Sequence, residues 1–344
     1  MVFSRERTCV GLDIGANSIK VVEVERHDDA ARVVRFGETA LPPDVIVDGE
    51  IMDRQVVIDA IRELYASCGI SRRRVVTGVH GRGVIVKKIV MDRMTREEAG
   101  DAIQWEAEQH VPYDPNDVSL DFQILDVDMG PRQMQVLLVA AKRDHVLQRA
   151  EIIREAGLTL DAVEVNCFAL HNLLEACSGN QPGETIALLN IGADITNVVV
   201  ARDGLPLYTQ DLSFGGMSFL QTIQKAHCLS REEALAALRD APRGIDLQGA
   251  LEELAADLSA SLDKALNYLR SSGEAERIDR ILVCGGGARI EGLGTVLTNH
   301  QSVPVSLLDP LAKLAGERRG NSGGDGETHS AGLAVGIGLA LRKE

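Results

Sequence analysis

The sequence predicts an α/β fold of two related lobes, with a subdomain inserted in the first lobe. At 344 residues the chain is longer than one hydrophobic core usually serves, so two lobes are the default expectation. An internal repeat supports this, because VGLDIGANSIKVV (10–22) resembles ALLNIGADITNVV (187–199) at a constant offset of 177 residues. A block of further strands and helices between the two copies indicates the insertion.

The composition is that of a folded globular chain, and it narrows the class of partner. Hydrophobic residues make up 45% and charged residues 25%, which leaves enough apolar surface for a core. There are 36 basic and 51 acidic residues, for a net charge of −15. Because basic patches normally supply non-specific affinity for DNA, RNA and anionic lipid, we expect no nucleic-acid partner.

Cysteine spacing and hydropathy predict a cytoplasmic chain without direct membrane insertion. The six cysteines form no C-x-x-C pair or regular framework, which is typical of reduced cytosolic thiols. The first residues contain no apolar segment of the kind that a signal peptide requires. Residues 331–341 are apolar, but they are too short to span a bilayer and include three glycines, so we expect a packed terminal helix. A membrane role would then depend on a partner.

Each copy of the repeat predicts two strands joined by a glycine-containing hairpin, because an apolar run, a D/N-I-G-A turn and a β-branched run follow one another. In the block after the first copy, Thr95 and Glu98 form a capping box that opens a helix ending by Pro112. The other elements expected there are strands at 75–79, 84–90, 120–127 and 134–140, and a helix with Val146, Ala150 and Ile153 on one face that ends at Gly157.

The second half of the chain predicts helices that follow the second hairpin. Ser230 and Glu233 form another capping box. A leucine stripe then marks one face of a long helix, through Leu247, Leu251, Leu254, Leu258, Leu262, Leu266 and Leu269. We expect this stripe to pack in the core, with a coiled-coil interface as the alternative. Residues 316–329 are polar and glycine-rich, which predicts a mobile loop before the terminal helix.

The first hairpin has the residue types of a phosphate site. Asp13 ends a strand and can hold hydrated Mg²⁺ through water, since that ion takes few protein ligands. Gly15 permits the tight turn, after which the backbone N–H groups of Ala16, Asn17 and Ser18 can point at a phosphate. Lys20 adds a positive charge. The second hairpin can close over the other phosphates from the opposite side.

A glycine run completes the set of candidate binding elements. Gly285, Gly286 and Gly287 follow a buried strand and precede a helix, where backbone without side chains lets adenine or ribose approach. The three elements in this order predict nucleotide binding. The chain has no P-loop, no H-E-x-x-H zinc helix and no G-x-S-x-G elbow, and GGGARI lacks the third glycine of a dinucleotide fingerprint.

The order of these motifs resembles a known superfamily. D-I-G-x-x-S-x-K, x-I-G-A-x-x-T and G-G-G-A-R are similar to the phosphate-one, phosphate-two and adenosine motifs of actin, sugar kinases and heat-shock chaperones. The resemblance implies an actin-like ATPase fold with two lobes around a nucleotide cleft. Within that superfamily, residues 104–125, VLLVAAKRD (136–144) and the closing AGLAVGIGLALR resemble the PilM family of type IV pilus assembly proteins. This similarity covers essentially the whole chain.

The family resemblance implies a scaffold on the cytoplasmic face of the inner membrane. Its expected partner is the N-terminal cytoplasmic tail of a PilN-like membrane protein, bound in a groove of the first lobe, and the pilus motor ATPase is a further candidate. The insertion is a subdomain that this family shares with the division protein FtsA. The implied domains are 1–81 plus 158–184 for the first lobe core, 82–157 for the insertion, 185–215 plus 274–344 for the second lobe core, and 216–273 for its smaller subdomain.

Carried over by position, the resemblance assigns residues to each part of the nucleotide. Mg²⁺ and the first phosphate site would be bound by Asp13, Gly15, Asn17, Ser18 and Lys20. The second phosphate loop would contain Gly192 and Thr196. The adenosine would lie against Gly285, Gly286 and Gly287. ATP or ADP with Mg²⁺ are the implied cofactors.

Three departures from the family pattern predict slow or absent ATP hydrolysis. Asn190 stands where the second phosphate motif usually has aspartate, which makes it a weak metal residue. Asn166 stands near a water-orienting acidic residue and is a poor base, with a helix N-cap as its alternative role. Leu235 and Leu238 replace a glutamate and a lysine, whose nearest substitutes are Glu233 and Arg239.

Two other functions remain as alternatives. A small-molecule kinase of the same superfamily would need a catalytic aspartate facing a substrate pocket, and no aspartate stands in a recognisable setting for that role. A self-polymerising filament like FtsA would be expected to anchor itself through a basic amphipathic tail, whereas this sequence closes with LALRKE.

Overall fold

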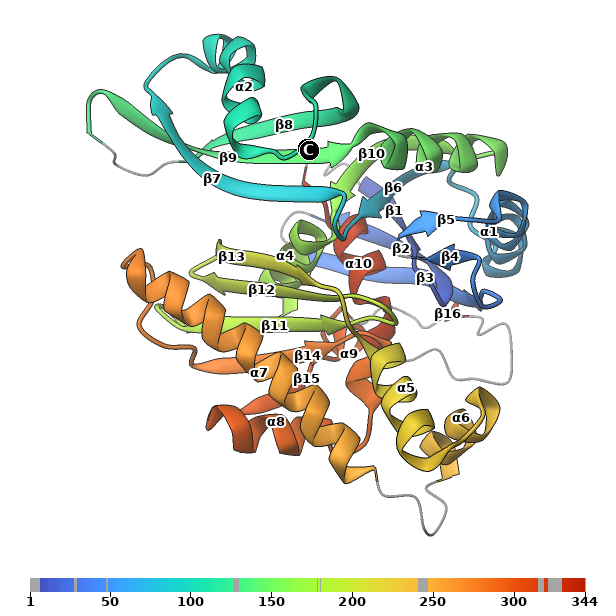
Figure 1. Cartoon of the computed structure of the whole chain (residues 1–344). Coiled ribbons are helices and arrows are strands. Elements are labelled where there is room, and N and C mark those ends of the chain that lie inside the picture. The colour runs from blue at the N-terminus through green and yellow to red at the C-terminus, as the bar shows by residue number, and fades with distance from the viewer. Residues whose placement is uncertain are drawn as a thin grey trace.

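The computed structural model describes residues 7–27, 30–47, 49–125, 130–177, 179, 181–240, 247–314, 319–320 and 330–343. Two mixed sheets form its framework (Figure 1), and the strands run in the orders β10-β6-β1-β2-β3-β16 and β13-β12-β11-β14-β15. The loop predicted at 316–329 lies outside the described residues, except for Arg319–Gly320, which form strand β16 at the edge of the first sheet.

The first sheet contains β1 (Arg7–Ile14), β2 (Ser18–His27), β3 (Ala30–Ala40), β6 (Arg74–Val79), β10 (Thr159–Val165) and β16. The second contains β11 (Thr185–Ile191), β12 (Thr196–Arg202), β13 (Leu205–Leu212), β14 (Arg280–Cys284) and β15 (Val305–Leu307). A small ribbon joins β4 (Ile46–Val47) to β5 (Glu50–Ile51). Strands β1 and β6 are parallel, as are β11 and β14, so each sheet has a core of parallel strands beside antiparallel hairpins.

The internal repeat corresponds to two equivalent hairpins, as predicted. Strands β1 and β2 are antiparallel, and so are β11 and β12. The Gly15 N–H donates to the Ser18 carbonyl at 3.1 Å, and the Gly192 N–H donates to the Ile195 carbonyl at 3.0 Å. Gly192 and Ile195 lie 177 residues after Gly15 and Ser18, which is the offset of the sequence repeat. The two lobes therefore share a local turn geometry as well as a sequence pattern.

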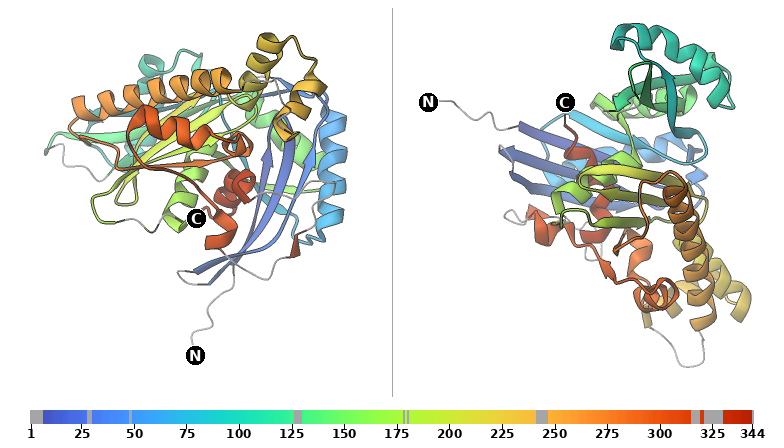
Figure 2. Two further views of the ribbon diagram at one scale, coloured as in Figure 1. Left: turned by 90° about the horizontal axis from the view of Figure 1, so that it is seen from below. Right: turned by 90° about the vertical axis from the view of Figure 1, so that its left-hand side faces the viewer.

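A third sheet forms the insertion in the first lobe. It pairs β7 (Val84–Asp92) and β8 (Val118–Leu125) with the central β9 (Gln133–Lys142), and α2 (Arg96–His110) packs against it with its own buried cluster. The predicted capping box is confirmed, since Thr95 Oγ1 accepts from the Glu98 N–H and the Glu98 carboxylate accepts from the Thr95 N–H. A short 3₁₀ turn, η1 (Pro115–Asp117), leads into β8. Figure 2 shows this layer projecting beyond the rest of the molecule.

Helices cover both faces of the first sheet. On one face, α1 (Arg54–Cys68) and α3 (Arg143–Glu155) pack with β1, and Ile152 and Ile153 of α3 are buried beside Leu12 and Ile58. Residues 143–157, which the domain prediction assigned to the insertion, thus pack with the first-lobe core. Helix α3 also contacts the inserted sheet, where Arg143 Nη2 donates to the Val118 carbonyl of β8 at 3.3 Å, so the predicted boundaries, with the insertion at 82–157, stay proposals.

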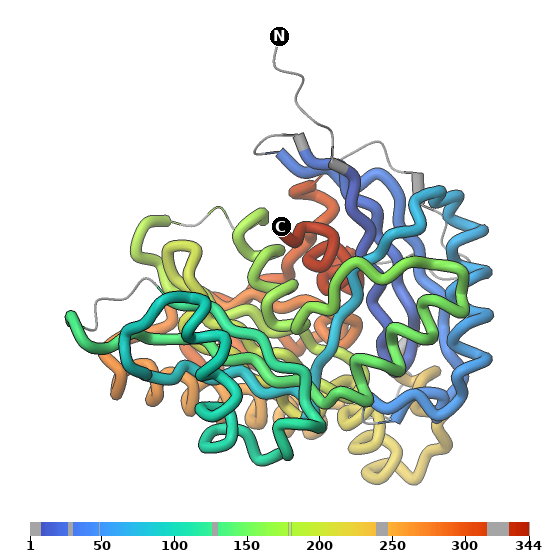
Figure 3. The backbone as a smooth tube through the Cα atoms, turned by 90° about the horizontal axis from the view of Figure 1, so that it is seen from above, coloured from blue at the N-terminus to red at the C-terminus, as the bar shows by residue number. Residues whose placement is uncertain are grey.

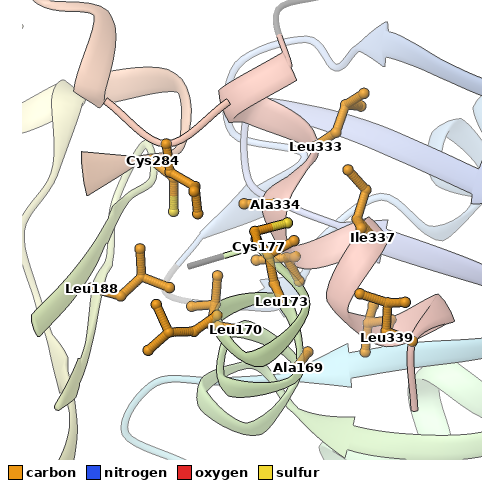
Figure 4. Packing of buried hydrophobic residues seen from close by; sticks show 14 of the residues in the cluster. Ala169, Leu170, Leu173, Cys177, Leu188, Cys284, Leu333, Ala334, Ile337 and Leu339 are labelled. Carbon is orange, nitrogen blue, oxygen red and sulfur yellow. The ribbon is translucent and has the colours of Figure 1, made fainter. Parts of the chain in front are cut away.

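Two apolar helices form the layer between the main sheets. Helix α4 (Asn166–Cys177) and helix α10 (Ala334–Ala340) lie side by side there, and Leu170 and Leu173 face Leu188 of the second sheet (Figure 4). The predicted packed terminal helix is confirmed. Helix α10 lies so close to its neighbours that a Cβ on Gly11 would overlap the Gly336 carbonyl, and a Cβ on Gly338 would overlap the Ala169 carbonyl. Over the residues that the structure describes, we find no helix with the length and hydropathy to cross a membrane.

The second lobe carries α5 (Gly216–His227), α6 (Arg231–Asp240), α7 (Gln248–Ser271) and α8 (Leu293–Gln301). The predicted Ser230–Glu233 capping box is present, with bonds of 2.8 and 3.2 Å. The leucine stripe of α7 packs in the core of this lobe, as expected. The remaining elements are η2 (Gly286–Arg289), α9 (Pro310–Lys313) and η3 (Ser330–Leu333).

Candidate functional site

The candidate site lies where the parallel strands of both lobes end. Asp13 stands near the carboxyl end of β1, beside β6, and Asn166 directly follows β10. In the second lobe Asn190 is paired with Cys284, after which the glycine run begins. In open α/β sheets ligands bind outside the carboxyl ends of the strands. The topology therefore brings the predicted residues from distant parts of the sequence to the same edge of each sheet.

Three polar side chains cross the first lobe as a ladder over neighbouring strands. Asp13 on β1 is the register partner of Lys20 on β2, which in turn is the partner of Glu38 on β3. Lys20 Nζ lies 3.7 Å from Asp13 Oδ2 and 4.0 Å from Glu38 Oε1. The Ser18 hydroxyl donates to Glu38 Oε1 at 2.7 Å. The ladder holds one cation between two carboxylates beside the first turn.

The second lobe has a corresponding ladder in which the first two members are neutral. Asn190 Nδ2 donates to Asn197 Oδ1 at 2.8 Å, and Asn197 Nδ2 donates to Asp211 Oδ1 at 2.6 Å. Asn190 and Asn197 lie 177 residues after Asp13 and Lys20, and Asp211 is the register partner of Asn197 just as Glu38 is of Lys20. The predicted loss of charge at Asn190 is thus accompanied by the loss of its lysine counterpart.

At two glycines of the run, protein atoms already occupy the space that a side chain would need. Gly285 has φ +86°, and a Cβ there would overlap the Ile191 carbonyl. A Cβ on Gly287 would overlap the Ile191 side chain, whereas Gly286 has nothing within 4 Å. Packing on β11 therefore accounts for two of the glycines, and only Gly286 offers open backbone. Gly286 and Gly287 are the first residues of the 3₁₀ turn η2, and the predicted helix, α8, follows that turn.

The second turn packs against the N-terminus of α5. The Gly192 carbonyl accepts from the Gly216 N–H at 2.9 Å. Thr196 is fully buried, and its hydroxyl donates to the Phe214 carbonyl at 2.9 Å. Its assignment as a phosphate contact stays a prediction, since in this arrangement the hydroxyl is used within the protein.

The two lobes meet at Asp211 and Gly81. The Gly81 N–H, just after β6, donates to Asp211 Oδ2 at 2.6 Å, and Ile195 of the second turn packs beside Gly81. Asp211 Oδ1 also accepts from the Cys167 thiol at 3.3 Å. Burial, followed by the negative charge of Asp211, raises the pKa of Cys167 well above its ordinary value, so that this thiol stays protonated. One carboxylate thus joins the second ladder to the end of β6 and to α4.

Two basic side chains lie behind the first turn. Burial and the charge of Arg149 lower the pKa of His80, while the charges of Asp211 and Asp13 act in the opposite direction. Burial lowers the pKa of Arg149 to about 10, against the opposing effect of Asp13. His80 Nδ1 and Arg149 Nη1 are both buried and have no hydrogen-bond partner among the described residues. The Arg149 Nη1 atom is a donor in every state of the guanidinium, and such an unbonded buried donor fits an anion such as a phosphate.

Asn166 is 4% exposed and begins helix α4. Its Oδ1 atom lies beside Gly78 and accepts no hydrogen bond within the described part of the chain, so the alternative role as a helix cap is not supported. Among described residues, no group of three or more His, Cys, Asp or Glu side chains could hold a metal ion. Asp13 therefore remains a proposed metal residue through water alone.

Other predicted residues lie away from these contacts. Asn17 is exposed, and its carbonyl accepts from the Leu41 N–H. Leu235 is 41% exposed, Leu238 packs on the core of the second lobe, and Glu233 is used by its capping box. The Arg239 side chain lies outside the described residues.

Sequence reasoning missed five residues of this region: Glu38, His80, Arg149, Asn197 and Asp211. Two of them had a usable signal. Asn197 is the repeat counterpart of Lys20, and Arg149 interrupts the apolar face that contains Val146, Ala150 and Ile153. Glu38 and Asp211 depend on the register of a third strand outside the repeat, which the sequence does not reveal.

Comparisons with known proteins identify relatives across the whole chain. The model of the family described as type IV pilus assembly protein PilM matches residues 11–344. Among solved structures, the PilM-PilN type IV pilus biogenesis complex contains a chain that is 26% identical, with a TM-score of 0.82 and 97% of both chains covered. The ethanolamine utilization protein EutJ from Carboxydothermus hydrogenoformans is 15% identical, with a TM-score of 0.59 over 97% of this chain and 89% of that one.

More distant relatives share the fold. MreB5 of Spiroplasma citri, solved with AMPPNP, is 12% identical, with a TM-score of 0.50 over 90% of this chain and 93% of that one. The cell division protein FtsA of Bacillus subtilis is 24% identical over 258 residues, which are 65% of this chain and 56% of the relative. The present chain therefore spans little more than half of that protein. These likenesses confirm the predicted actin-like ATPase fold.

Proposed function

This chain belongs to the PilM family of type IV pilus assembly proteins, and on that premise we propose that it is a scaffold of the pilus assembly complex that binds a PilN-like protein. The observation that carries the proposal is the likeness to the PilM-PilN complex, which extends over 97% of both chains at a TM-score of 0.82. The kinase and filament alternatives have no comparable support. We propose that the chain works in the cytoplasm, held at the inner membrane by its partner.

The proposed contact is with the N-terminal cytoplasmic tail of the PilN-like protein. Isothermal titration of the purified chain with a peptide copying that tail is expected to give saturable binding. A scrambled peptide of the same composition serves as the control, and it keeps charge and length while removing the sequence. Equal or absent binding of the two peptides to folded protein would contradict the proposal. The motor ATPase is a second proposed partner, which the same titration can test.

We further propose that ATP or ADP binds between the lobes, with Mg²⁺ held through water by Asp13. Three features support this: the two turns of the repeat, the ladder that contains Lys20, and the buried atoms His80 Nδ1 and Arg149 Nη1, which have no hydrogen-bond partner among the described residues. The shared fold with a protein solved with AMPPNP and with ADP is consistent with it. Bound Mg²⁺ would supply positive charge between the phosphates and Asp13.

Lys20→Ala tests the nucleotide proposal. The lysine is the cation of the first ladder, and its loss is expected to weaken ATP binding about tenfold or more through the missing phosphate charge. Lys264→Ala, which removes the same charge from an exposed position on α7, is the matched control. Fluorescence titration with a labelled nucleotide measures both. An unchanged affinity in Lys20→Ala would place the phosphates elsewhere.

We propose that bound ATP is hydrolysed slowly or not at all. The amide of Asn166 cannot act as a base toward water, and Asn190 uses its amide within the second ladder. Nucleotide would then act as a structural ligand that biases lobe closure. Phosphate release measured over hours is expected to stay near the buffer rate.

A further inference from the structure

Arg149 is a buried arginine that forms no ion pair within the described part of the chain, although the charge of Asp13 acts on it. It lies on α3, and the residue is 4% exposed. Its Nη1 atom makes no hydrogen bond, and no described carboxylate forms an ion pair with it. Burial lowers its pKa to about 10, so the guanidinium remains charged at neutral pH.

Packing alone does not explain an arginine at this position. The neighbouring residues on α3, Ile152 and Ile153, are fully buried in the apolar cluster of the first lobe. A methionine or leucine would continue that face without placing a charge in the core. A buried charge without a partner is costly, whereas one that meets an anion and is fully hydrogen-bonded can be retained. The position of Arg149 therefore points to an anionic ligand.

The surroundings of Arg149 place that anion next to the first turn. Asp13, at the end of β1, is the carboxylate whose charge acts on Arg149. His80 follows the adjacent strand β6, and the charges of Arg149 and Asp13 both act on its pKa. Its Nδ1 atom is a second buried polar atom without a hydrogen-bond partner among the described residues. Helix α3 reaches this edge at its first turn, where His145 lies beside Gly83 in the segment that follows β6, so Arg149, one turn further along α3, lies near His80 and Asp13.

Arg149 is a second cation at this place, in addition to the lysine of the first ladder. Lys20 is already shared between Asp13 and Glu38, at 3.7 and 4.0 Å. Arg149 adds a positive charge from a different element, on the far side of the sheet from α4 and α10. In the proposed site the turn and Lys20 would meet the first two phosphates, and the additional cation would then be available for one more phosphate. A guanidinium fork matches the oxygens of a terminal phosphate in geometry and charge.

We infer that Arg149 binds the terminal phosphate of a nucleoside triphosphate and so gives the site its preference for ATP over ADP. The inference rests on the proposed nucleotide binding and assigns a specificity residue to that site. Its position on α3 matters as well, because α3 directly follows β9, the central strand of the inserted sheet. Contact with the third phosphate is made by an element that is continuous with the insertion.

Calorimetric titration of ATP and ADP against matched variants tests the inference. Arg149→Gln is expected to weaken ATP binding at least tenfold and ADP binding less than threefold. Arg154→Gln removes the same charge from an exposed position on the same helix, and is expected to change neither affinity. If Arg149→Gln does not fold, Arg149→Lys keeps the charge and loses the fork, and is expected to lower the ATP-to-ADP preference about threefold.

The outcomes separate the inference from the proposed function. If wild-type protein binds both nucleotides and the Arg149 variants leave the ratio of affinities unchanged, the inference is wrong and nucleotide binding stands. If wild-type protein binds neither, both are wrong. Inorganic phosphate provides a further arm: if it stabilises wild-type protein but not Arg149→Gln against heat, while the nucleotide ratio is unchanged, the site takes a free anion and the inference is overturned.

Discussion

Asn190 and Asn197 show how single residues set the chemistry of the second ladder. Asp211 can only accept hydrogen bonds, so Asn197 must turn its Nδ2 toward it and its Oδ1 toward Asn190. Asn190 must then donate, which it does at 2.8 Å. The hydrogen bonds therefore run in one direction, and a carboxylate at position 190 would face an acceptor.

Restoring the family's aspartate at position 190 alone is thus expected to destabilise the protein. Asn190→Asp should lower the free energy of unfolding by about 1–3 kcal/mol, because it buries a charged acceptor against Asn197 Oδ1. The double variant Asn190→Asp with Asn197→Lys copies the first ladder and is expected to regain much of that loss. Urea unfolding at neutral pH measures all three proteins. A stabilised single variant would show that the ladder is not directional.

His171 on α4 provides a pH prediction at the same scale. Burial lowers its pKa below the ordinary value of 6.5, against the charge of Glu175, and its Nε2 atom is buried without a partner among the described residues. The unfolded chain therefore binds a proton below about pH 6.5 that folded His171 does not, and stability falls as the pH decreases. The group contributes its stability above pH 6.5.

His171→Gln is expected to make that acid-dependent loss shallower by up to about 1.4 kcal/mol per pH unit. His80 and His145, whose pKa values are also lowered, would cause the remainder. Unfolding by urea from pH 7.5 to 5 measures the slope, and the difference between the proteins at pH 7.5 is the internal control. Parallel slopes for wild type and variant would contradict the prediction.

At the scale of elements, α10 depends on small residues where it meets β1 and α4. Gly338→Ala would push a methyl group into the Ala169 carbonyl of α4, where backbone meets backbone. We expect a loss of about 3 kcal/mol in stability from overpacking. Gly332→Ala, a change at a position with nothing within 4 Å, is the control and is expected to have little effect. Thermal unfolding of both variants checks the difference.

Most elements could be predicted from the sequence because their signals are local. The Thr95–Glu98 box, the leucine stripe of α7 and the two glycine turns each depend on residues a few positions apart. Contacts between elements could not be predicted in this way. The hydroxyl of Thr196 bonds to Phe214, and Asp211 reaches Gly81 across the lobes, because the sheets bring together segments that the sequence keeps apart.

The insertion contacts the second lobe as well as the first. Lys88 on β7 pairs with Glu274 at 2.7 Å and donates to the Leu207 carbonyl on β13 at 3.1 Å. Figure 3 shows the molecule from above, with the insertion over the strands of the second lobe and away from α1. A relative movement of the lobes would therefore also change the contacts of the inserted sheet.

For the whole molecule, several contacts among the described residues join the two halves of the repeat. Helices α4 and α10 share one buried cluster with both sheets, and Asp211 bonds to the end of β6. A ligand between the two turns would contact both lobes and so change the balance between open and closed arrangements. Binding of the tail that we propose as a partner would then respond to the same balance.

The most direct test of this account is the affinity of the PilN-like tail peptide for the purified chain without nucleotide, with Mg·ADP and with Mg·ATP. The account predicts saturable binding whose dissociation constant differs about fivefold or more between the ATP-bound and nucleotide-free protein, with an equal reciprocal effect of the peptide on ATP. Binding of the same strength in all three states, with nucleotide occupancy verified, would contradict coupling between the inter-lobe site and the scaffold function.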